Sequence, residues 1–378
     1  MSETGPTTPA GELTAQLKAE ARRLGFTLVG VCPAIAPTGA TRLAEWLDRG
    51  YAGEMAYLAT RKQAYEHPRH VMEATRSVVM LGLPYGTIAP APVRVGEGRV
   101  SRYAWGNADY HDVIHDKLKR LIVALRQLEP EAKARGVVDT APLLEREFAQ
   151  LAGLGWVGKH TLLINKPEGS YFFLAALLTD RELAYDEPFG ADHCGTCRAC
   201  LDACPTQAFP QPYVLDASRC ISYLTIELRG PVPHELRSGM GEWLFGCDVC
   251  QEVCPWNQRT PVSEERAFQP GNTNPINLAE LFYLDDDGFR ARFRATPLWR
   301  PRRRGILRNA AIVLGNQKAK AATEALVRGL NDTEALVRGA CAWALGQLQG
   351  KDAVEALMHR RSIETDEVVR KEIEMAIG

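Results

Sequence analysis

The sequence has no long apolar segment and almost no net charge. Its longest apolar run, Tyr171 to Leu178, is far shorter than the roughly 20 residues that a membrane-spanning helix needs. The first residues, MSETGPTTPAGEL, lack the basic and apolar regions of a secretory signal, so we expect a cytoplasmic protein. The 45 basic and 46 acidic residues leave a net charge of −1, which disfavours a uniformly basic nucleic-acid binder but permits a local basic patch.

Cysteine is distributed very unevenly along the chain. Eight of the ten cysteines lie between Cys194 and Cys254. In a reducing compartment, cysteines crowded in this way bind metals more often than they form disulfides. The other two, Cys32 and Cys341, lie among apolar residues, as is typical of small core side chains.

The spacing of the crowded cysteines is that of bacterial ferredoxins. Residues 194–205 follow C-x2-C-x2-C-x3-C-P, in which three thiolates bind one [4Fe–4S] cluster and the fourth binds a second cluster. A second run, 247–255, lacks its first cysteine, and Cys220 is the spare thiol nearby. We assign Cys194, Cys197, Cys200 and Cys254 to a first cluster and Cys204, Cys220, Cys247 and Cys250 to a second. Zinc is the competing interpretation, which the two C-x3-C-P ends disfavour.

The pattern of apolar residues predicts an α+β protein with more than one domain. Helical patterns at 11–25, 41–59, 108–128 and 142–152 alternate with strand patterns at 26–31, 77–83, 136–139 and 171–178. We expect an α/β catalytic domain over 1–185, a ferredoxin-like domain over 186–262, a basic connecting segment over 263–300 and helical repeats over 301–378. The cysteine-rich part has little periodicity of its own, so bound metal would provide its order.

The C-terminal part repeats itself. An arginine within a similar apolar pattern recurs at 308, 338 and 370, and this spacing predicts helical hairpins of the HEAT type. So few repeats cannot easily stand alone, so we expect them to pack on the rest of the chain. The repeats alone do not distinguish a binding surface from a capping bundle.

One segment is strongly basic. Between Gly288 and Thr323 there are ten arginines and lysines and no acidic residue, with three aromatic residues interleaved. Such a run is often a solvated face, but it also suits contacts with RNA phosphates and stacking on bases. The candidate nucleic-acid contacts are Arg300, Arg302, Arg303, Arg304 and Arg308.

The glycines at 153, 155 and 158 match G-x-G-x-x-G, but a helical pattern precedes them where a dinucleotide site needs a strand. The end of a helix, or close approach of the backbone to a large ligand, is the favoured interpretation.

Together these motifs resemble the epoxyqueuosine reductase family. The resemblance covers nearly the whole chain and rests on 53–58, 101–106, 109–111, 138–146, 152–159, 163–165 and 220–227, with the double cluster spacing and the HEAT-like end. It implies a base-off cobalamin between the N-terminal domain and the cluster domain. It also implies that epoxyqueuosine in a tRNA anticodon is reduced to queuosine, with two electrons and two protons removing the epoxide oxygen as water.

The resemblance also implies roles for individual residues. Asp139 would be the proton donor, as a carboxylic acid kept neutral by burial; from local sequence alone it is a cap for the N–H groups of 140–143. The candidate cobalamin contacts are Arg61, Tyr103, His111, Gly155, Gly158, Asn165 and Ser222. For Arg61, Asn165 and Ser222 the alternatives are a surface ion pair, a turn residue and a helix cap.

Two other functions compete with the tRNA-modifying oxidoreductase. One is a cobalamin enzyme like the reductive dehalogenases that acts on a small molecule, and the other is a non-catalytic iron–sulfur electron-transfer module. The basic segment and the repeats favour the tRNA enzyme. We expect it to be a monomer that takes electrons from an external donor.

Overall fold

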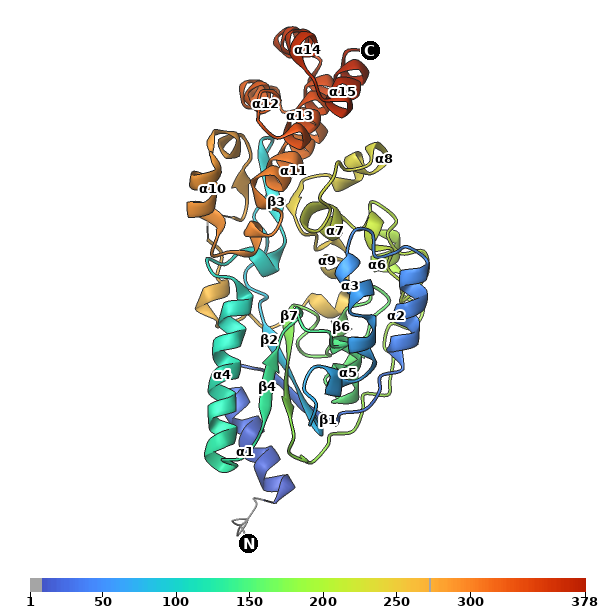
Figure 1. Ribbon diagram of the computed structural model, residues 1–378, viewed down its shortest axis with the longest axis vertical. Helices are drawn as coiled ribbons and strands as arrows, with labels where there is room; N and C mark the ends of the chain where they lie inside the picture. The colour runs from blue at the N-terminus through green and yellow to red at the C-terminus, as the bar shows by residue number, and fades with distance from the viewer. Residues whose placement is uncertain (1–8, 272) are drawn as a thin grey trace.

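The computed structural model describes residues 9–271 and 273–378 and is elongated, with the N-terminal part at one end and the C-terminal helices at the other (Figure 1). The cysteine-rich segment lies between these two parts. In the described ranges, no helix has the length and the apolar character needed to cross a membrane.

A four-stranded sheet with the order β1-β2-β7-β4 forms the centre of the N-terminal part, and all its pairs are antiparallel. Its strands are β1 (Leu28–Pro33), β2 (Ser77–Pro84), β4 (Ala134–Val137) and β7 (Phe172–Thr179). The central strand β2 is buried along its whole length, as its unbroken apolar sequence predicts. An antiparallel sheet with separate covering helices is the α+β arrangement.

Helices cover both faces of this sheet. Successive side chains of a strand point to opposite faces, so Val79 and Leu81 of β2 pack toward α1 (Ala10–Arg23) and α4 (Tyr110–Leu128). Val78 and Met80 pack toward α5 (Glu145–Leu151) on the other face. Two further helices, α2 (Gly39–Asp48) and α3 (Ala56–Thr60), lie on the α5 side in Figure 1.

The cysteine-rich segment contains only short elements. A small hairpin of β5 (Trp156–Val157) and β6 (Leu163–Ile164) precedes it. Its helices are α6 (Ala199–Asp202), α7 (Ile221–Ile226), α8 (His234–Arg237) and α9 (Val249–Glu252). The two ferredoxin-like runs provide α6 and α9, and these two helices lie in contact.

A second sheet joins distant parts of the chain. In it, β3 (Glu97–Val100) pairs parallel to β8 (Trp243–Phe245) and antiparallel to β9 (Ile276–Asn277). These strands come from three of the four parts that we expected from the sequence. The boundaries at 185, 262 and 300 therefore stay a prediction.

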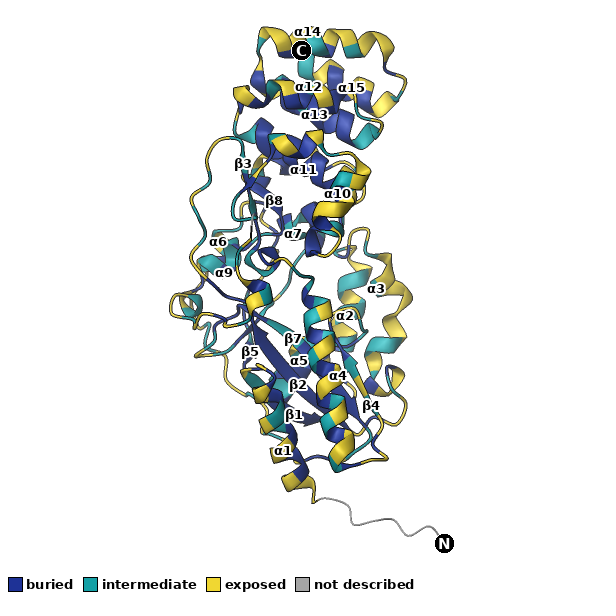
Figure 2. Ribbon diagram, turned by 90° about the vertical axis from the view of Figure 1, so that its left-hand side faces the viewer, coloured by how far each residue is buried: buried dark blue, intermediate teal, exposed yellow. Residues whose placement is uncertain are grey.

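The C-terminal helices pack on the cluster segment, which confirms the expectation that the repeats do not stand alone. They are α10 (Asp286–Phe293), α11 (Arg302–Asn316), α12 (Thr323–Leu330), α13 (Ala335–Leu348), α14 (Lys351–Ile363) and α15 (Glu367–Ile377). Figure 2 shows that α11 and α13 are mostly buried and that α14 presents much exposed surface. The recurring Arg338 bonds Glu364, which joins α13 to the segment between α14 and α15.

Candidate active site

A cavity of about 520 Å³ lies where the N-terminal sheet meets the cluster segment. Much of its wall is aromatic, with Tyr103, Tyr110, Phe172 and Phe173 among the residues that line it. The cluster segment contributes Cys220, Ser222, Tyr223, Cys247 and Cys250. The carboxyl groups on the wall include those of Asp139 and Glu145, so acid–base groups and thiols face one common space.

Asp139 is held by side chains of α4. It follows the end of β4 by two residues, and its Oδ2 accepts a hydrogen bond from the hydroxyl of Tyr110. Its Oδ1 lies 2.7 Å from His111 Nε2. Among the described residues, none of the N–H groups of 140–143 donates to Asp139, and α5 begins only at Glu145. The interpretation of Asp139 as a helix cap is therefore wrong.

His111 is fixed between two carboxylates by the start of α4. Asp109 is the N-cap residue of α4 and accepts a hydrogen bond from the His111 backbone N–H at 3.0 Å. The same oxygen lies 2.7 Å from His111 Nδ1, while Nε2 faces Asp139. Burial opposes the charge, but the hydrogen bonds to Asp109 and Asp139 raise the pKa of His111 to about 9. His111 is therefore an imidazolium at neutral pH.

This environment reverses the charge state that the sequence suggested for Asp139. Burial alone would raise its pKa, but the hydrogen bond and charge of His111, helped by Tyr110 and Arg300, lower the pKa below its usual value. Asp139 is thus a carboxylate at neutral pH, not an acid kept neutral by burial. The available proton lies on His111, one hydrogen bond away.

Two buried polar atoms on the cavity wall have no partner among the described residues. One is Oε1 of Glu145, whose pKa is raised to about 8 by burial and by the charge of Asp139. The other is Nε2 of His160. Buried polar groups are nearly always hydrogen-bonded, so Oε1 of Glu145 favours a bound group with polar substituents in this cavity, whereas His160 also borders a second cavity.

The structure gathers the first predicted quartet of cysteines around a cavity of its own. Cys194, Cys197, Cys200 and Cys254 all line a space of about 260 Å³. Within 9–271 and 273–378, no three His, Cys, Asp or Glu side chains converge closely enough to hold a single metal ion. The thiols thus surround a space, which is what a cube with one iron per thiolate requires.

Three cysteines of the second predicted quartet, Cys220, Cys247 and Cys250, line the active-site cavity instead. Burial raises the pKa of the Cys220 thiol, and the thiol of Cys204 contributes to this shift, so Cys204 lies near Cys220. The second quartet is therefore the one that faces Asp139 across the cavity.

Asp248 connects this cysteine loop to the N-terminal part. It lies between Cys247 and Cys250, is buried, and accepts hydrogen bonds from the Ser101 hydroxyl and, at 2.8 Å, from the Arg102 backbone N–H. Burial raises the pKa of Asp248 to about 6, although the hydrogen bonds from Ser101 and Arg102 act to lower it. The contact positions the next residue, Tyr103, on the cavity wall.

The other candidate cobalamin contacts divide into two groups. Tyr103 and Ser222 line the cavity. Asn165 does not, because its amide donates to Leu154 O at 2.7 Å and its oxygen accepts from Glu168 N, which makes it a turn residue. Arg61 is exposed and donates to Thr140 O at 3.1 Å, beside Asp139.

The two predicted glycine contacts have local structural reasons. A Cβ at Gly155 would lie 2.0 Å from Ile164 O, and a Cβ at Gly158 would lie 2.5 Å from the Ile164 side chain. Neither is among the residues that line the cavity. Both glycines allow β5 and β6 to approach each other, and their assignment as cofactor contacts stays a prediction.

The five predicted nucleic-acid arginines have different positions. Arg308 is 1% exposed and donates to the carbonyls of Leu224, Leu228 and Gly230, so it cannot reach a phosphate and that prediction is wrong. Arg303 donates to Leu284 O and to Asp332, which neutralises it. Arg302 and Arg304 are exposed.

Arg300 lies in the active-site cavity. Its Nη2 donates to Tyr110 Oη at 2.9 Å and lies 2.8 Å from His111 Nε2. Sequence reasoning missed this role, as it missed Tyr110, Glu145 and His160. Tyr110 and Glu145 each had a signal, since they lie in the segments 109–111 and 138–146 on which the resemblance to the family rests.

A cavity lined both by carboxyl side chains and by cysteines with iron–sulfur spacing is typical of an oxidoreductase. Family models described as epoxyqueuosine reductase QueG, as a 4Fe-4S double cluster binding domain and as HEAT repeats match residues 66–140, 193–257 and 303–378. The epoxyqueuosine reductase of Pseudomonas aeruginosa is 40% identical over 90% of this chain and 95% of its own length. That of Escherichia coli is 37% identical over 89% of each. The chain belongs to the epoxyqueuosine reductase family.

Solved structures agree with this assignment. A crystal structure of epoxyqueuosine reductase with an epoxyqueuosine-modified tRNA-Tyr stem loop has a TM-score of 0.90 at 30% identity, covering 97% of this chain and 98% of that chain. The enzyme from Bacillus subtilis, in a structure described as having its catalytic aspartate loop swung out of the active site, has a TM-score of 0.89 at 29% identity, with the same coverage. The chain is an oxidoreductase with a double [4Fe–4S] cluster domain and HEAT repeats.

Proposed function

We propose that the protein reduces epoxyqueuosine to queuosine in the anticodon of tRNA, at a cobalamin that receives electrons from two [4Fe–4S] clusters. The observation that carries this proposal is the active-site cavity itself, in which Asp139 and the thiols Cys220, Cys247 and Cys250 face one space. A reductive deoxygenation needs both a proton supply and an electron supply at the C–O bond that breaks.

The residues present fit a cobalamin. The wall of the active-site cavity is largely aromatic and apolar, and its unpartnered atom Glu145 Oε1 could bond an amide group at the edge of a corrin ring. Tyr103 and Ser222 remain proposed contacts. When bound, cobalamin supplies reduced cobalt that delivers electrons to the epoxide.

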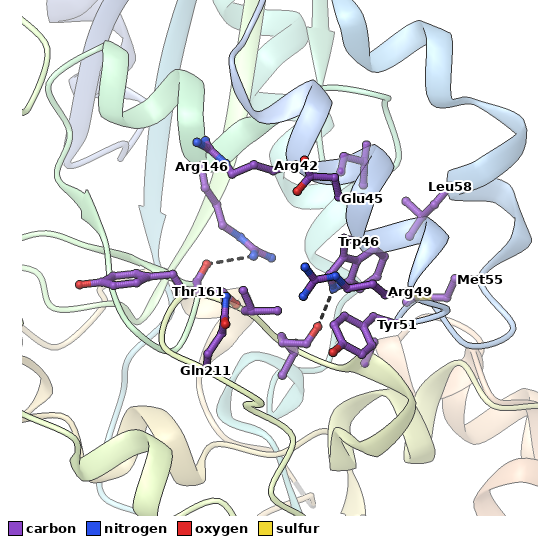
Figure 3. A pocket seen from close by; sticks show the side chains of 15 residues that line it. Arg42, Glu45, Trp46, Arg49, Tyr51, Met55, Leu58, Arg146, Thr161 and Gln211 are labelled. Atoms are coloured by element: carbon purple, nitrogen blue, oxygen red, sulfur yellow. Dashed lines mark hydrogen bonds between the residues drawn. The ribbon is translucent and has the colours of Figure 1, made fainter.

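A neighbouring cavity fits the nucleotide tail of a base-off cobalamin. It has a volume of about 550 Å³ and shares Met55, Arg146, Thr161, Leu215 and Ala217 with the active-site cavity. Arg42, Arg49 and Arg146 would neutralise the phosphate of the tail, and Trp46 and Tyr51 offer aromatic surface for its base (Figure 3). Trp46 is held in place by its Nε1–H bond to Leu215 O at 2.6 Å.

Asp139 would pass protons from His111 to the epoxide oxygen. The conversion takes two electrons and two protons and releases the oxygen as water, so the oxygen must be protonated as its bonds to carbon break. The His111 imidazolium holds a proton at neutral pH and lies 2.7 Å from Asp139. The cation of Arg300 lies against the same group and would stabilise negative charge on the leaving oxygen.

Electrons would enter at the first cluster and leave at the second. Cys197 of the first quartet is exposed, so that cluster would be the one accessible to an external donor. Three thiols of the second quartet line the active-site cavity, so the second cluster would deliver electrons to the bound cofactor. The contact between α6 and α9, which carry Cys200 and Cys250, brings the two quartets together.

The substrate would be the anticodon stem-loop of a tRNA, bound by a single copy of the chain. A relative was crystallised with such a stem loop. Arg302 and Arg304 are exposed at the start of α11, and the guanidinium of Arg302 stacks on Trp299 at 4.3 Å. The modified base must reach Asp139, so it would be flipped out of the loop into the cavity.

The two exposed arginines provide a test of this surface. A double substitution of Arg302→Ala and Arg304→Ala should weaken binding of an anticodon stem-loop and reduce the slope of log affinity against log salt by about 2, because two phosphate contacts are lost. Filter binding over a range of NaCl concentrations measures this slope. Arg370→Ala, which removes an exposed arginine of α15, is the control and should leave the slope unchanged. A wild-type affinity that does not depend on salt would contradict the proposal.

The reaction itself is tested by nucleoside mass spectrometry. Protein reconstituted anaerobically with iron, sulfide and cobalamin is incubated with reductant and tRNA that contains epoxyqueuosine. We expect queuosine to appear and epoxyqueuosine to disappear. Unchanged epoxyqueuosine with a fully loaded protein would reject the proposed reaction, and failure to take up cobalamin would reject the proposed cofactor.

A further inference from the structure

The cavity of the first cysteine quartet has a buried hydrogen-bond donor on its wall that nothing in the described chain satisfies. His160 is 3% exposed, and its Nε2 has no hydrogen-bond partner among the described residues. The side chain lines the cavity together with Cys194, Cys197, Cys200 and Cys254. A buried donor left without an acceptor destabilises the folded protein, so an acceptor is expected when the cofactors are bound.

The hydrogen bonds of the turn fix which ring nitrogen of His160 carries the proton. The Leu162 backbone N–H donates to Nδ1 at 3.1 Å, so Nδ1 is the acceptor. Burial lowers the pKa of His160 to about 4, so the ring is neutral at neutral pH. A neutral ring with Nδ1 as acceptor has its single proton on Nε2. The unpartnered atom is therefore an N–H donor.

The turn that carries His160 rests directly on the loop of the first quartet. Its neighbour Lys159 donates through Nζ to the carbonyls of Gly195 and Cys197, at 2.5 and 2.8 Å. The hairpin on either side of the turn packs against Cys254 through Trp156 and Ile164. These contacts fix His160 relative to the first quartet.

We propose that His160 donates its Nε2–H to a sulfur atom of the [4Fe–4S] cluster bound by Cys194, Cys197, Cys200 and Cys254, and thereby raises the reduction potential of this cluster. The proposal rests on the cluster assignment made above. One-electron reduction adds a negative charge to the cluster, and an N–H donor to sulfur stabilises that charge. A higher potential makes the first cluster easier to reduce by the external donor.

The experiment is an EPR-monitored redox titration of the full chain, reconstituted with both clusters and without cobalamin or tRNA. His160→Phe keeps an aromatic ring but removes the donor, and His160→Asn keeps an N–H donor. We expect His160→Phe to lower the equilibrium constant for reduction of one cluster about tenfold, which is about 59 mV for one electron. The second cluster should keep its reduction potential in both variants. The reduction potential of the first cluster should fall less in His160→Asn than in His160→Phe.

The titration separates this proposal from the proposed function, because it needs no substrate and no cobalamin. Unchanged potentials in His160→Phe, with the full iron content, would overturn it. If cobalamin affinity fell instead, the acceptor would be the cofactor in the active-site cavity, which His160 also lines. His160→Leu serves as a second variant without a donor; loss of the first cluster from both variants would make His160 a structural residue and would also overturn the proposal.

Discussion

Asp139→Asn is expected to lower turnover by roughly 10²–10⁴-fold, the usual contribution of a positioned acid–base group, while cobalamin still binds. An amide cannot pass a proton from His111 to the substrate, although it has nearly the same size and can still bond Tyr110. Queuosine formation is measured by mass spectrometry of tRNA nucleosides, and cobalamin uptake by the visible spectrum.

Asp112→Asn is a matched control for this substitution. Asp112 lies in the first turn of α4 and is exposed, so its charge lies close to His111 along the chain but contacts neither His111 nor Asp139 among the described residues. This control should turn over at the wild-type rate. Normal turnover in the Asp139→Asn variant, or loss of cobalamin together with activity, would contradict the role of Asp139 as a proton-transferring group.

Cys220→Ala should abolish turnover by removing one of the two clusters. Cys220 is distant in sequence from the other cysteines of its quartet, but as the N-cap residue of α7 it reaches the active-site cavity beside Cys247 and Cys250. Three thiolates and no fourth ligand hold a [4Fe–4S] cluster poorly. Iron analysis should show about half of the wild-type iron, and the potential of the first cluster should be retained.

Cys32→Ala is the corresponding control. The Cys32 thiol is buried against the Val78 and Phe148 carbonyls in the N-terminal core and belongs to neither quartet. This variant should keep the full iron content and its activity in the folded protein. Full iron content in Cys220→Ala would instead show that another ligand completes the second cluster, and the proposed quartet would be wrong.

The sequence predicted most elements of the N-terminal part, because their apolar periodicity is strong and local. The patterns at 77–83 and 171–178 became β2 and β7, and the pattern at 108–128 became α4. Their order in the sheet was not predictable, because strand pairing depends on contacts between segments far apart in the chain. The same holds for β3, which leaves the first part of the chain to pair with β8 and β9.

The arginine run shows the limit of reasoning from charge alone. As a sequence, Arg300, Arg303 and Arg308 belonged to one basic surface. In the fold, the packing of α11 on α7 points these three side chains to different places. Arg300 reaches the active site, Arg303 pairs with Asp332, and Arg308 donates to a carbonyl just after α7. Charge counted along the chain does not show which face of a helix is buried or which acidic residue of a distant segment lies opposite.

The sequence by itself determined the double iron–sulfur segment, because the ligand spacing of such clusters is set within short loops and needs little knowledge of the rest of the fold. Only the tertiary structure decided the state of the proton-transfer group. Asp139, which follows β4, contacts Tyr110 and His111 at the start of α4. Arg300, 190 residues beyond Tyr110 in the sequence, joins this group. Burial alone would have raised the pKa of Asp139, whereas these neighbours lower it and make Asp139 a carboxylate beside a protonated histidine, since their hydrogen bonds and charges outweigh desolvation.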